Sequence, residues 1–496
     1  MTLDKGAQRA LIAIFFALLA VPYVIAWFAP AVGLYYRDAA GLVTAEAIAA
    51  GHGYVIASLP NAVAETKDPP FFPAVLALFV LVSRHALWLK VLPLGCLAGW
   101  LALTRRLLLK MGASRNASLW LVGLTAACPA VVFLGTTLIA ESLFALLVTA
   151  ALLMLLEERA LAAGIFAGLA TLTLTVGVPL IVACIVTLVV RRRLRAAAIF
   201  TAVAMAMVAP WFGWSLAHAA RDYAGGNYVA GDIFTGLAAS EKLVVLGSNV
   251  MLLLGAPVSL LTGGWSGSFE IAGTVVVLLF CWIVRRQLVP DLFVVLYCLM
   301  LLCWTRPPAR FVTPVLPLVF WIVWRVLRLL SLREALAALV LLITALPLWA
   351  DAVRLPATLA DGYFAAEGQP PDNWREMRKL FNFIRANTPE QSILLANLDP
   401  VFYLNTGRRA VRGFVPNGYD LYYAPRQRAL TPDQLSHEIM ASRVNYVVLT
   451  PDSGLPESVS FHKSVEALER GGVLVPVGMP GESPDYRLLQ VAQPGF

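Results

Sequence analysis

Residues 10–30 of the chain are ALIAIFFALLAVPYVIAWFAP, and the polar sequence Tyr35-Tyr36-Arg37-Asp38 follows shortly after. An apolar stretch of about 20 residues is long enough to cross a bilayer as a helix, whereas the apolar core of a secretory signal has only about 7–15 residues. Lys5 and Arg9 precede this stretch. We therefore predict an uncleaved signal anchor that forms the first transmembrane helix.

The composition extends this prediction to most of the chain. Of its 496 residues, 59% are hydrophobic and only 14% are charged, and the mean hydropathy is +0.75. Soluble domains carry about 25% charged residues, so we predict a polytopic α-helical membrane protein with about 11 transmembrane helices. The further apolar stretches are residues 87–104, 117–135, 138–156, 160–176, 177–190, 196–216, 269–284, 288–304, 312–324 and 335–350. Residues 243–262 are another apolar helix, which either lies at the membrane interface or enters the membrane.

Lysine and arginine alternate between the two sides of this predicted bundle. Sixteen lie in one set of loops: Lys5, Arg9, Arg105, Arg106, Lys110, Arg115, Arg159, Arg191, Arg192, Arg193, Arg195, Arg285, Arg286, Arg325, Arg328 and Arg333. Only eight lie in the other set before residue 351: Arg37, Lys67, Arg84, Lys90, Arg221, Lys242, Arg306 and Arg310. Cytoplasmic loops carry the excess of basic residues. The N-terminus is therefore predicted to be cytoplasmic and the C-terminus external, and the net charge of +8 is no indication of nucleic-acid binding.

The chain divides into two predicted domains. Residues 1–350 are the membrane domain, and its first outer loop is residues 31–86. From about residue 365 the composition becomes more polar, with an amphipathic helix predicted over 374–387. Ser392–Ala396 and Tyr446–Thr450 are short apolar runs rich in β-branched residues and are predicted to be buried strands. Residues 351–496 are thus expected to form a small α/β domain outside the membrane.

The first outer loop concentrates charged residues beside the membrane. Charge at a bilayer boundary is costly and usually functional. Residues 69–83 of the loop are apolar but short and begin with prolines, which favours an interfacial helix lying on the outer leaflet. Such a helix would keep Asp38 and Lys67 at membrane height. By itself, Asp38 is equally a loop acid or a helix cap.

Cofactor and metal motifs are not found in the sequence. The six cysteines lie within or beside apolar segments and the five histidines are scattered, so neither set has metal-ligand spacing. No glycine-rich phosphate loop follows a predicted strand, so a nucleotide donor has no evident site. We expect no cofactor and no metal.

Three parts of the first outer loop together form a family pattern. Asp38 begins it, Gly51-His52-Gly53-Tyr54 follows a predicted helix, and Lys67-Asp68-Pro69-Pro70 ends it. The pattern resembles the C-type glycosyltransferase (GT-C) superfamily, in particular the bacterial relatives of protein O-mannosyltransferases and of lipid A aminoarabinose transferases. There are two departures: Ala39 stands where the family often has a glutamate, and Asp68 interrupts the Lys-Pro-Pro motif.

The resemblance implies a GT-C fold and an inverting glycosyltransferase of the bacterial cytoplasmic membrane. Its donor would be a polyprenyl-phosphate-linked sugar, and its acceptor a lipid, glycan or protein at the outer face. Asp38 would be the catalytic base, because a sugar hydroxyl must lose its proton as it attacks the anomeric carbon. Glu141 corresponds to a second acid of the aminoarabinose transferases and would bind the acceptor or orient the base. Its alternative role is favourable contact with a helix N-terminus.

The donor phosphate would be held by outward-facing cations. Arg306-Pro-Pro-Ala-Arg310-Phe resembles an arginine motif near the end of the family's membrane domain, and Lys67 is the lysine of the Lys-Pro-Pro motif. Charge-assisted bonds from Lys67, Arg310 and Arg306 would stabilise the leaving phosphate. The alternative is that these side chains anchor the chain at lipid headgroups. Candidate substrate-binding residues are Tyr36, Glu65, Tyr223 and Tyr228, although Tyr36 is also a candidate interface aromatic and the loop of Tyr223 and Tyr228 is equally well explained as solvated.

Two other functions remain open from the sequence. A flippase or transporter of lipid-linked glycans would place charges near the bilayer midplane, often within inverted repeats. Here the acids lie at one face, and the sequence contains no evident repeat. A non-catalytic scaffold with a partner-binding outer domain is the other alternative.

Overall fold

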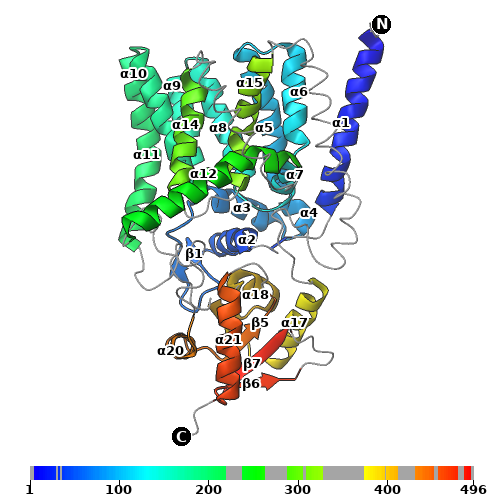
Figure 1. The fold of residues 1–496 in the computed structure, drawn as a ribbon, viewed down its shortest axis with the longest axis vertical. Coiled ribbons are helices and arrows are strands. Elements are labelled where there is room, and N and C mark those ends of the chain that lie inside the picture. Colours follow the sequence, from blue (N-terminus) through cyan, green and yellow to red (C-terminus); the bar gives the residue numbers. More distant parts are fainter. Residues whose placement is uncertain are drawn as a thin grey trace.

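The computed structural model describes residues 5–28, 32–33, 36–218, 237–262, 288–304, 309–327, 374–396, 398–411, 430–451, 456–478 and 485–492. The predicted spans 269–284 and 335–350 and the predicted domain boundary at 350 lie outside these ranges. Long helices run side by side along the major axis of the molecule, and a smaller part containing strands lies at the end opposite the N-terminus (Figure 1).

The larger part is helical. Its elements are α1 (Lys5–Phe28), α2 (Tyr36–Ala49), β1 (Val55–Ile56), β2 (Val63–Ala64), α3 (Phe71–Val82), α4 (Ala86–Leu89), α5 (Val91–Lys110), α6 (Arg115–Ala126), α7 (Pro129–Thr136), α8 (Glu141–Leu156), α9 (Ala160–Thr173), η1 (Thr175–Gly177), α10 (Val178–Val190), α11 (Leu194–His218), α12 (Ala239–Thr262), α14 (Leu288–Leu302), η3 (Ala309–Val315) and α15 (Leu316–Leu327). Helix α2 lies across the lower end of the bundle, and α12 runs obliquely over one side of it (Figure 1).

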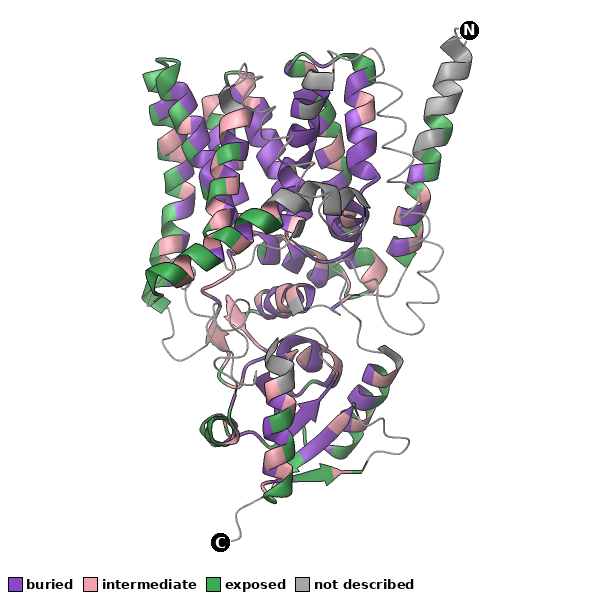
Figure 2. Cartoon of the chain, in the orientation of Figure 1, coloured by how far each residue is buried: buried purple, intermediate pink, exposed green. Residues whose placement is uncertain are grey.

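Helix length and composition agree with a membrane bundle. Within the described ranges, Ala86–Lys110 and Leu194–His218 are each long and apolar enough to cross a membrane, and several shorter helices are equally apolar. Valines on the outer face of α10 are exposed, as expected for side chains that face lipid: Val182, Val186 and Val190. Helix α8, in contrast, is buried along most of its length (Figure 2). The predicted number of about eleven spans and the orientation of the termini stay predictions.

One predicted span is wrong as a single helix. Residues 117–135 form two helices, α6 and α7, which meet at an angle of 70°. Pro129 causes the break, because a proline disfavours helical geometry at the residue before it and cannot donate a backbone hydrogen bond. Cys128 accordingly has extended geometry, with φ −69° and ψ 126°. Helix α7 consequently runs at a steep angle to α6.

Close helix packing in the bundle depends on small residues. Helices α9 and α11 make the most extensive contact between any two elements described. A Cβ atom at Gly164 of α9 would lie 2.9 Å from the carbonyl oxygen of Phe200 on α11. Small residues allow such close backbone approach in membranes, where helix association depends on van der Waals packing.

The smaller part is a mixed five-stranded sheet covered on both faces by helices. The strand order is β4-β3-β5-β7-β6, in which β3 pairs in parallel with β4 and β5, and β7 pairs antiparallel with β5 and β6. The elements are α17 (Trp374–Asn387), β3 (Ile393–Leu395), α18 (Asp399–Thr406), β4 (Arg409–Val411), α20 (Pro432–Ala441), β5 (Tyr446–Leu449), α21 (Pro456–Arg470), β6 (Leu474–Val477) and β7 (Arg487–Val491). The predicted helix over 374–387 and both predicted strands are therefore confirmed.

Strand β5 shows how the two faces of this sheet are assigned. Tyr446 and Val448 pack in the same cluster as α17 and α18, whereas Val447 and Leu449 pack with α20 and α21. Successive side chains of a strand point to opposite faces. All four side chains are buried because helices cover both faces, which explains the continuous apolar run in the sequence.

Helix α2 connects the two parts. It packs against α3 on the bundle side and against α18 on the other side. Ala39 of α2 is fully buried in the cluster formed by α17, α18 and the sheet. The loop after α2 also reaches the edge strand β4, because the backbone N–H of Ala410 donates to the carbonyl of Ser58 at 2.9 Å. The described residues of the predicted first outer loop are thus held between the bundle and the sheet.

Candidate active site

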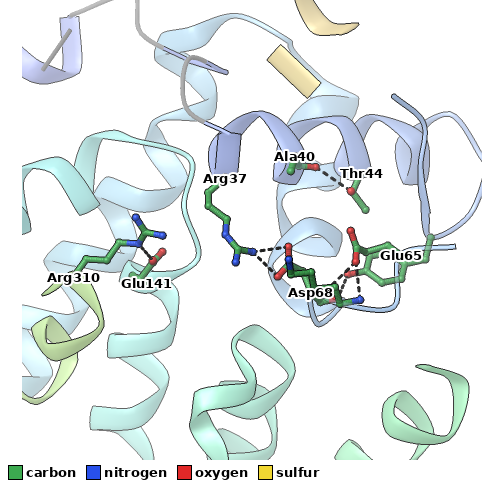
Figure 3. A network of polar contacts seen from close by, with 9 residues as sticks. Arg37, Ala40, Thr44, Glu65, Asp68, Glu141 and Arg310 are labelled. Atoms are coloured by element: carbon green, nitrogen blue, oxygen red, sulfur yellow. Dashed lines mark hydrogen bonds and ion pairs between the residues drawn. The ribbon is translucent and has the colours of Figure 1, made fainter. Parts of the chain in front are cut away.

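A cavity of about 70 Å³ lies where α2, α3, α8, η1 and η3 meet. Its walls are largely apolar, with side chains such as Phe72, Leu138 and Phe311. Four charged residues also line it: Arg37, Asp68, Glu141 and Arg310. These four come from segments that are far apart in the sequence, and they form two ion pairs that face each other (Figure 3).

The first ion pair joins α2 to the segment before α3. One guanidinium nitrogen of Arg37, Nη1, donates to both carboxylate oxygens of Asp68 at 2.7 and 2.9 Å. Each side chain is 34% exposed. Asp68 is the residue that interrupts the Lys-Pro-Pro motif, and its pairing with Arg37 explains how a carboxylate is accommodated there.

The second ion pair joins the N-terminus of α8 to η3. Arg310 donates through Nε to Oε1 of Glu141 at 2.8 Å, and the two side chains are only 20% and 6% exposed. Glu141 is the first residue of α8, where the helix dipole also favours a negative charge. The structure therefore brings together the predicted residues Glu141 and Arg310, which are 169 positions apart.

Glu65 stabilises the turn that carries Lys67 and Asp68. Its Oε1 accepts hydrogen bonds from the backbone N–H groups of Lys67 at 2.8 Å and of Asp68 at 3.0 Å. Burial, together with the negative charge of Asp68, raises the pKa of Glu65 to about 7. Predicted as a substrate-binding residue, Glu65 occupies a position in which it shapes the backbone beside the cavity.

Two further side chains hold the same turn, and neither was predicted from the sequence to be a site residue. The hydroxyl of Tyr54 donates to the carbonyl of Asp68, and the hydroxyl of Ser215 on α11 donates to the carbonyl of Thr66 at 2.7 Å. The ring of Tyr54 packs against Trp211 and Trp214 of α11. Tyr54 is the tyrosine of the Gly-x-Gly-Tyr motif, so the motif itself was the signal for this role.

The two glycines of that motif end helix α2. Gly51 and Gly53 have φ of +78° and +83°, in the left-handed region that only glycine adopts without strain. The backbone N–H of His52 donates to the carbonyl of Ala47 at 2.9 Å, which closes the last turn of the helix. The chain then turns back, and Tyr54 is directed toward Asp68.

Asp38 lies in the first turn of α2 and is completely buried. Its Oδ2 accepts a hydrogen bond from the backbone N–H of Gly33 at 2.8 Å. Arg37 and Gly41 line the cavity, but Asp38 is not among the lining residues. Because successive helical residues are rotated by about 100°, Asp38 lies on an adjacent face of α2.

A buried lysine near Asp38 was noted in the sequence only as a loop cation. Lys90 is 1% exposed and precedes α5. Its ammonium group donates to the carbonyl of Ala26 at 3.1 Å, at the end of α1, and it interacts electrostatically with Asp38. Buried charges in proteins are normally paired. Lys90 therefore supplies positive charge to the environment of Asp38 and joins α1 to α5.

The remaining predicted site residues do not line the cavity or lie outside the described part of the chain. Lys67 lies beside Asp68 in the turn, but it is not among the residues that line the cavity. Arg306, Tyr223 and Tyr228, as well as the side chain of Tyr36, lie outside the part of the chain that the structure describes. Across the described ranges, no group of three or more histidine, cysteine, aspartate or glutamate side chains has the arrangement of a metal site. The roles predicted for all these residues stay predictions.

The fold is shared with a known protein, although the sequence is distant from known families. No protein-family model matches the chain, and no curated protein matches its sequence. The crystal structure of ArnT from Cupriavidus metallidurans in the apo state covers 97% of this chain and 98% of its own, with a TM-score of 0.57 and 13% identity. The structure of ArnT from the same organism bound to undecaprenyl phosphate has the same coverage and identity, with a TM-score of 0.55.

This likeness establishes the class of fold. ArnT is a lipid A aminoarabinose transferase and a GT-C enzyme, so the chain has the GT-C fold of a multi-pass membrane protein. The resemblance predicted from the first outer loop is confirmed at this level. Because the likeness at 13% identity concerns the fold alone, the activity of the chain has to be argued from its own residues.

Proposed function

We propose that the chain is a glycosyltransferase of the bacterial cytoplasmic membrane. It would transfer a sugar from a polyprenyl-phosphate carrier to a lipid, glycan or protein acceptor at the outer face, with inversion at the anomeric carbon. The observation that carries the proposal is the Glu141–Arg310 pair at a cavity of about 70 Å³. This pair lies in a chain whose fold matches, over nearly its whole length, a protein solved with undecaprenyl phosphate.

The cavity has the chemistry that a phosphate leaving group requires. A largely apolar wall lowers the local dielectric constant, so a cation there interacts strongly with negative charge. Arg310 is oriented by Glu141 and packs beside Phe311, with its guanidinium carbon 5.7 Å from the ring centroid. Lys67, in the turn beside the cavity, would be the second cation. Such pre-oriented donors stabilise charge that develops in the transition state.

In the proposed reaction, the acceptor hydroxyl loses its proton to the carboxylate of Asp38. The acceptor oxygen forms a new bond to the anomeric carbon as the bond between that carbon and the phosphate oxygen breaks. The carrier phosphate leaves with the bonding electrons and is stabilised by Arg310 and Lys67. Catalytic contacts are often loose in proteins without substrate and tighten in the complex, so the buried position of Asp38 is compatible with this role.

A reconstituted system tests this proposal against lipid transport. Mass spectrometry of lipids, glycans and surface proteins from strains with and without the gene would first identify the product and its sugar. The purified protein in proteoliposomes would then receive the corresponding undecaprenyl-phosphate-linked sugar and acceptor. Glycosylated acceptor and free undecaprenyl phosphate are expected in equal amounts. An intact donor that appears on the opposite leaflet would instead identify a flippase. If the donor is neither cleaved nor moved, the non-catalytic scaffold is the remaining explanation.

A further inference from the structure

The cavity contains a second arginine to which the proposed function assigns no role. Arg37 and Arg310 approach the cavity from different elements, α2 and η3, and each forms an ion pair with a carboxylate there (Figure 3). Two cations and two anions thus share one small space. An anionic ligand that enters it must compete with the resident carboxylates for the guanidinium groups.

The two ion pairs differ in how readily a phosphate can replace the carboxylate that binds each arginine. The Glu141–Arg310 pair is mostly buried, and separating it would leave an uncompensated charge in a protein interior. The Arg37–Asp68 pair is only partly buried, with both side chains about one-third exposed, and solvent that reaches an ion pair reduces its contribution to stability. Arg37 is therefore the guanidinium that an incoming phosphate can take over from its carboxylate at low cost.

The structure also indicates which partner moves. The backbone of Asp68 is held on both sides, because its N–H donates to Glu65 and its carbonyl accepts from Tyr54. Arg37 contacts Asp68 only through the end of a long, flexible side chain. Rotation about its side-chain bonds would move the guanidinium away from Asp68 without a change in the backbone of α2.

We propose that Arg37 is a donor-phosphate ligand and that Asp68 is its resident counter-ion, which competes with the donor. The proposal rests on the function proposed above and adds to it a residue and a mode of control. A phosphate offers several acceptor oxygens to the planar guanidinium fork, whereas in the resting pair a single nitrogen of Arg37 serves both oxygens of Asp68. When the donor binds, Arg37 releases Asp68 and forms hydrogen bonds with the oxygens of the donor phosphate instead.

The test measures binding of undecaprenyl phosphate to the full chain in nanodiscs of phosphatidylcholine. Arg37→Gln should weaken binding about 10-fold or more, because a hydrogen bond between charged groups is lost. Asp68→Asn should tighten binding about 2- to 5-fold, because the competing charge is removed while the side-chain shape is kept. In an Arg37→Gln background, Asp68→Asn should have a smaller effect, since there is no arginine to release.

A second ion pair that includes a residue of α2 provides a matched control. Glu46 of α2 and Arg84, which follows α3, form an ion pair at 3.5 Å that does not line the cavity. Glu46→Gln and Arg84→Gln should leave undecaprenyl phosphate binding unchanged. Competition with inorganic phosphate distinguishes the source of the phosphate: a lipid-linked ligand should resist millimolar concentrations, and displacement by them would argue against a lipid donor.

The outcomes separate this inference from the proposed function. If Arg37–Asp68 is only a structural tether, Arg37→Gln and Asp68→Asn should weaken binding together, and the inference is overturned. The inference also fails alone if Arg310→Gln weakens binding but Arg37→Gln does not. If the wild-type chain does not bind undecaprenyl phosphate, or Arg310→Gln binds it normally, the proposed donor site itself is wrong.

Discussion

The first outer loop and the α8–α9 hairpin lie beside each other at the cavity but use their residues differently. Between residues 36 and 70 the chain places Arg37, Asp38, Glu46, Glu65, Lys67 and Asp68. Helices α8 and α9 contain Glu141 as their only charged residue, at the first position of α8. Apart from Glu141, the hairpin contributes packing, whereas the loop contributes oriented charge. Substitutions of the charged residues should therefore alter reaction rate or ligand binding, and substitutions of the apolar and small residues of the hairpin should alter stability.

The largest effect is expected at Asp38. Asp38→Asn should lower turnover about 10²- to 10⁴-fold, the usual contribution of a general base. The amide keeps the shape of the side chain and can still accept the N–H of Gly33, so the variant should still fold and bind undecaprenyl phosphate. Its melting temperature should fall, because the buried ammonium of Lys90 loses the negative charge with which it interacts. Steady-state turnover of the purified variant tests this, with Glu46→Gln on the same helix as the control. Turnover close to wild type would remove Asp38 from the mechanism.

A smaller loss is expected at the donor phosphate. Arg310→Lys should lower turnover about 10-fold or more, with a weaker effect on donor affinity, because the leaving phosphate gains negative charge as its bond to the sugar breaks. An ammonium group reproduces neither the bidentate fork nor the contact of Nε with Glu141. Rate and affinity should be measured together for Arg310→Lys and for Lys67→Gln. Wild-type rates in both variants would mean that other residues hold the phosphate.

A substitution at Gly164 tests the close packing of the α8–α9 hairpin against α11. Gly164→Ala should destabilise the protein by about 1–3 kcal/mol, because the new methyl group would be forced against the backbone of Phe200 on α11. Turnover per folded molecule should stay at the wild-type value. Gly95→Ala in α5 is the matched control, since a Cβ atom there meets nothing within 4 Å. Thermal unfolding in detergent measures both variants, and equal melting temperatures would contradict the close approach of α9 and α11.

The pH dependence of stability should reveal the buried carboxyl of Glu65. Its pKa in the folded protein, about 7, is above the ordinary value of 4.5. The stability associated with its protonated form is fully present below about pH 4.5 and is lost as the pH rises through about 7, by up to about 3 kcal/mol. Glu65→Gln keeps an acceptor oxygen but cannot ionise. Its melting temperature should therefore fall less than that of the wild type between pH 5 and 8, and parallel curves would contradict the assigned burial.

The smallest effect is expected from removal of metal ions. Activity should survive exhaustive chelation by EDTA, because a single phosphate can be neutralised by Arg310 and Lys67. Turnover before and after chelation, with and without added Mg²⁺ or Mn²⁺, measures this. If EDTA abolished activity and a divalent ion restored it, Asp38 and Glu141 would have to be reconsidered as metal ligands.

Several elements followed from the sequence alone because their signals are local. The amphipathic period over 374–387 predicted α17 to the residue, and the apolar β-branched runs predicted β3 and β5. The break between α6 and α7 was missed although Pro129 was visible, because prolines are tolerated within membrane helices. The hairpin of β1 and β2 was also missed, because each strand has only two residues.

The sequence by itself predicted a membrane protein, a concentration of charge between residues 36 and 68, and Asp38, Glu141 and Arg310 as candidates for chemistry. These conclusions depend on composition, periodicity and short motifs, which neighbouring residues specify. Only the tertiary structure decided that Glu141 pairs with Arg310 and Arg37 with Asp68, and that Asp38 is buried and interacts electrostatically with Lys90. Such contacts depend on how distant helices pack, and a pairing across 169 positions leaves no local pattern in the sequence.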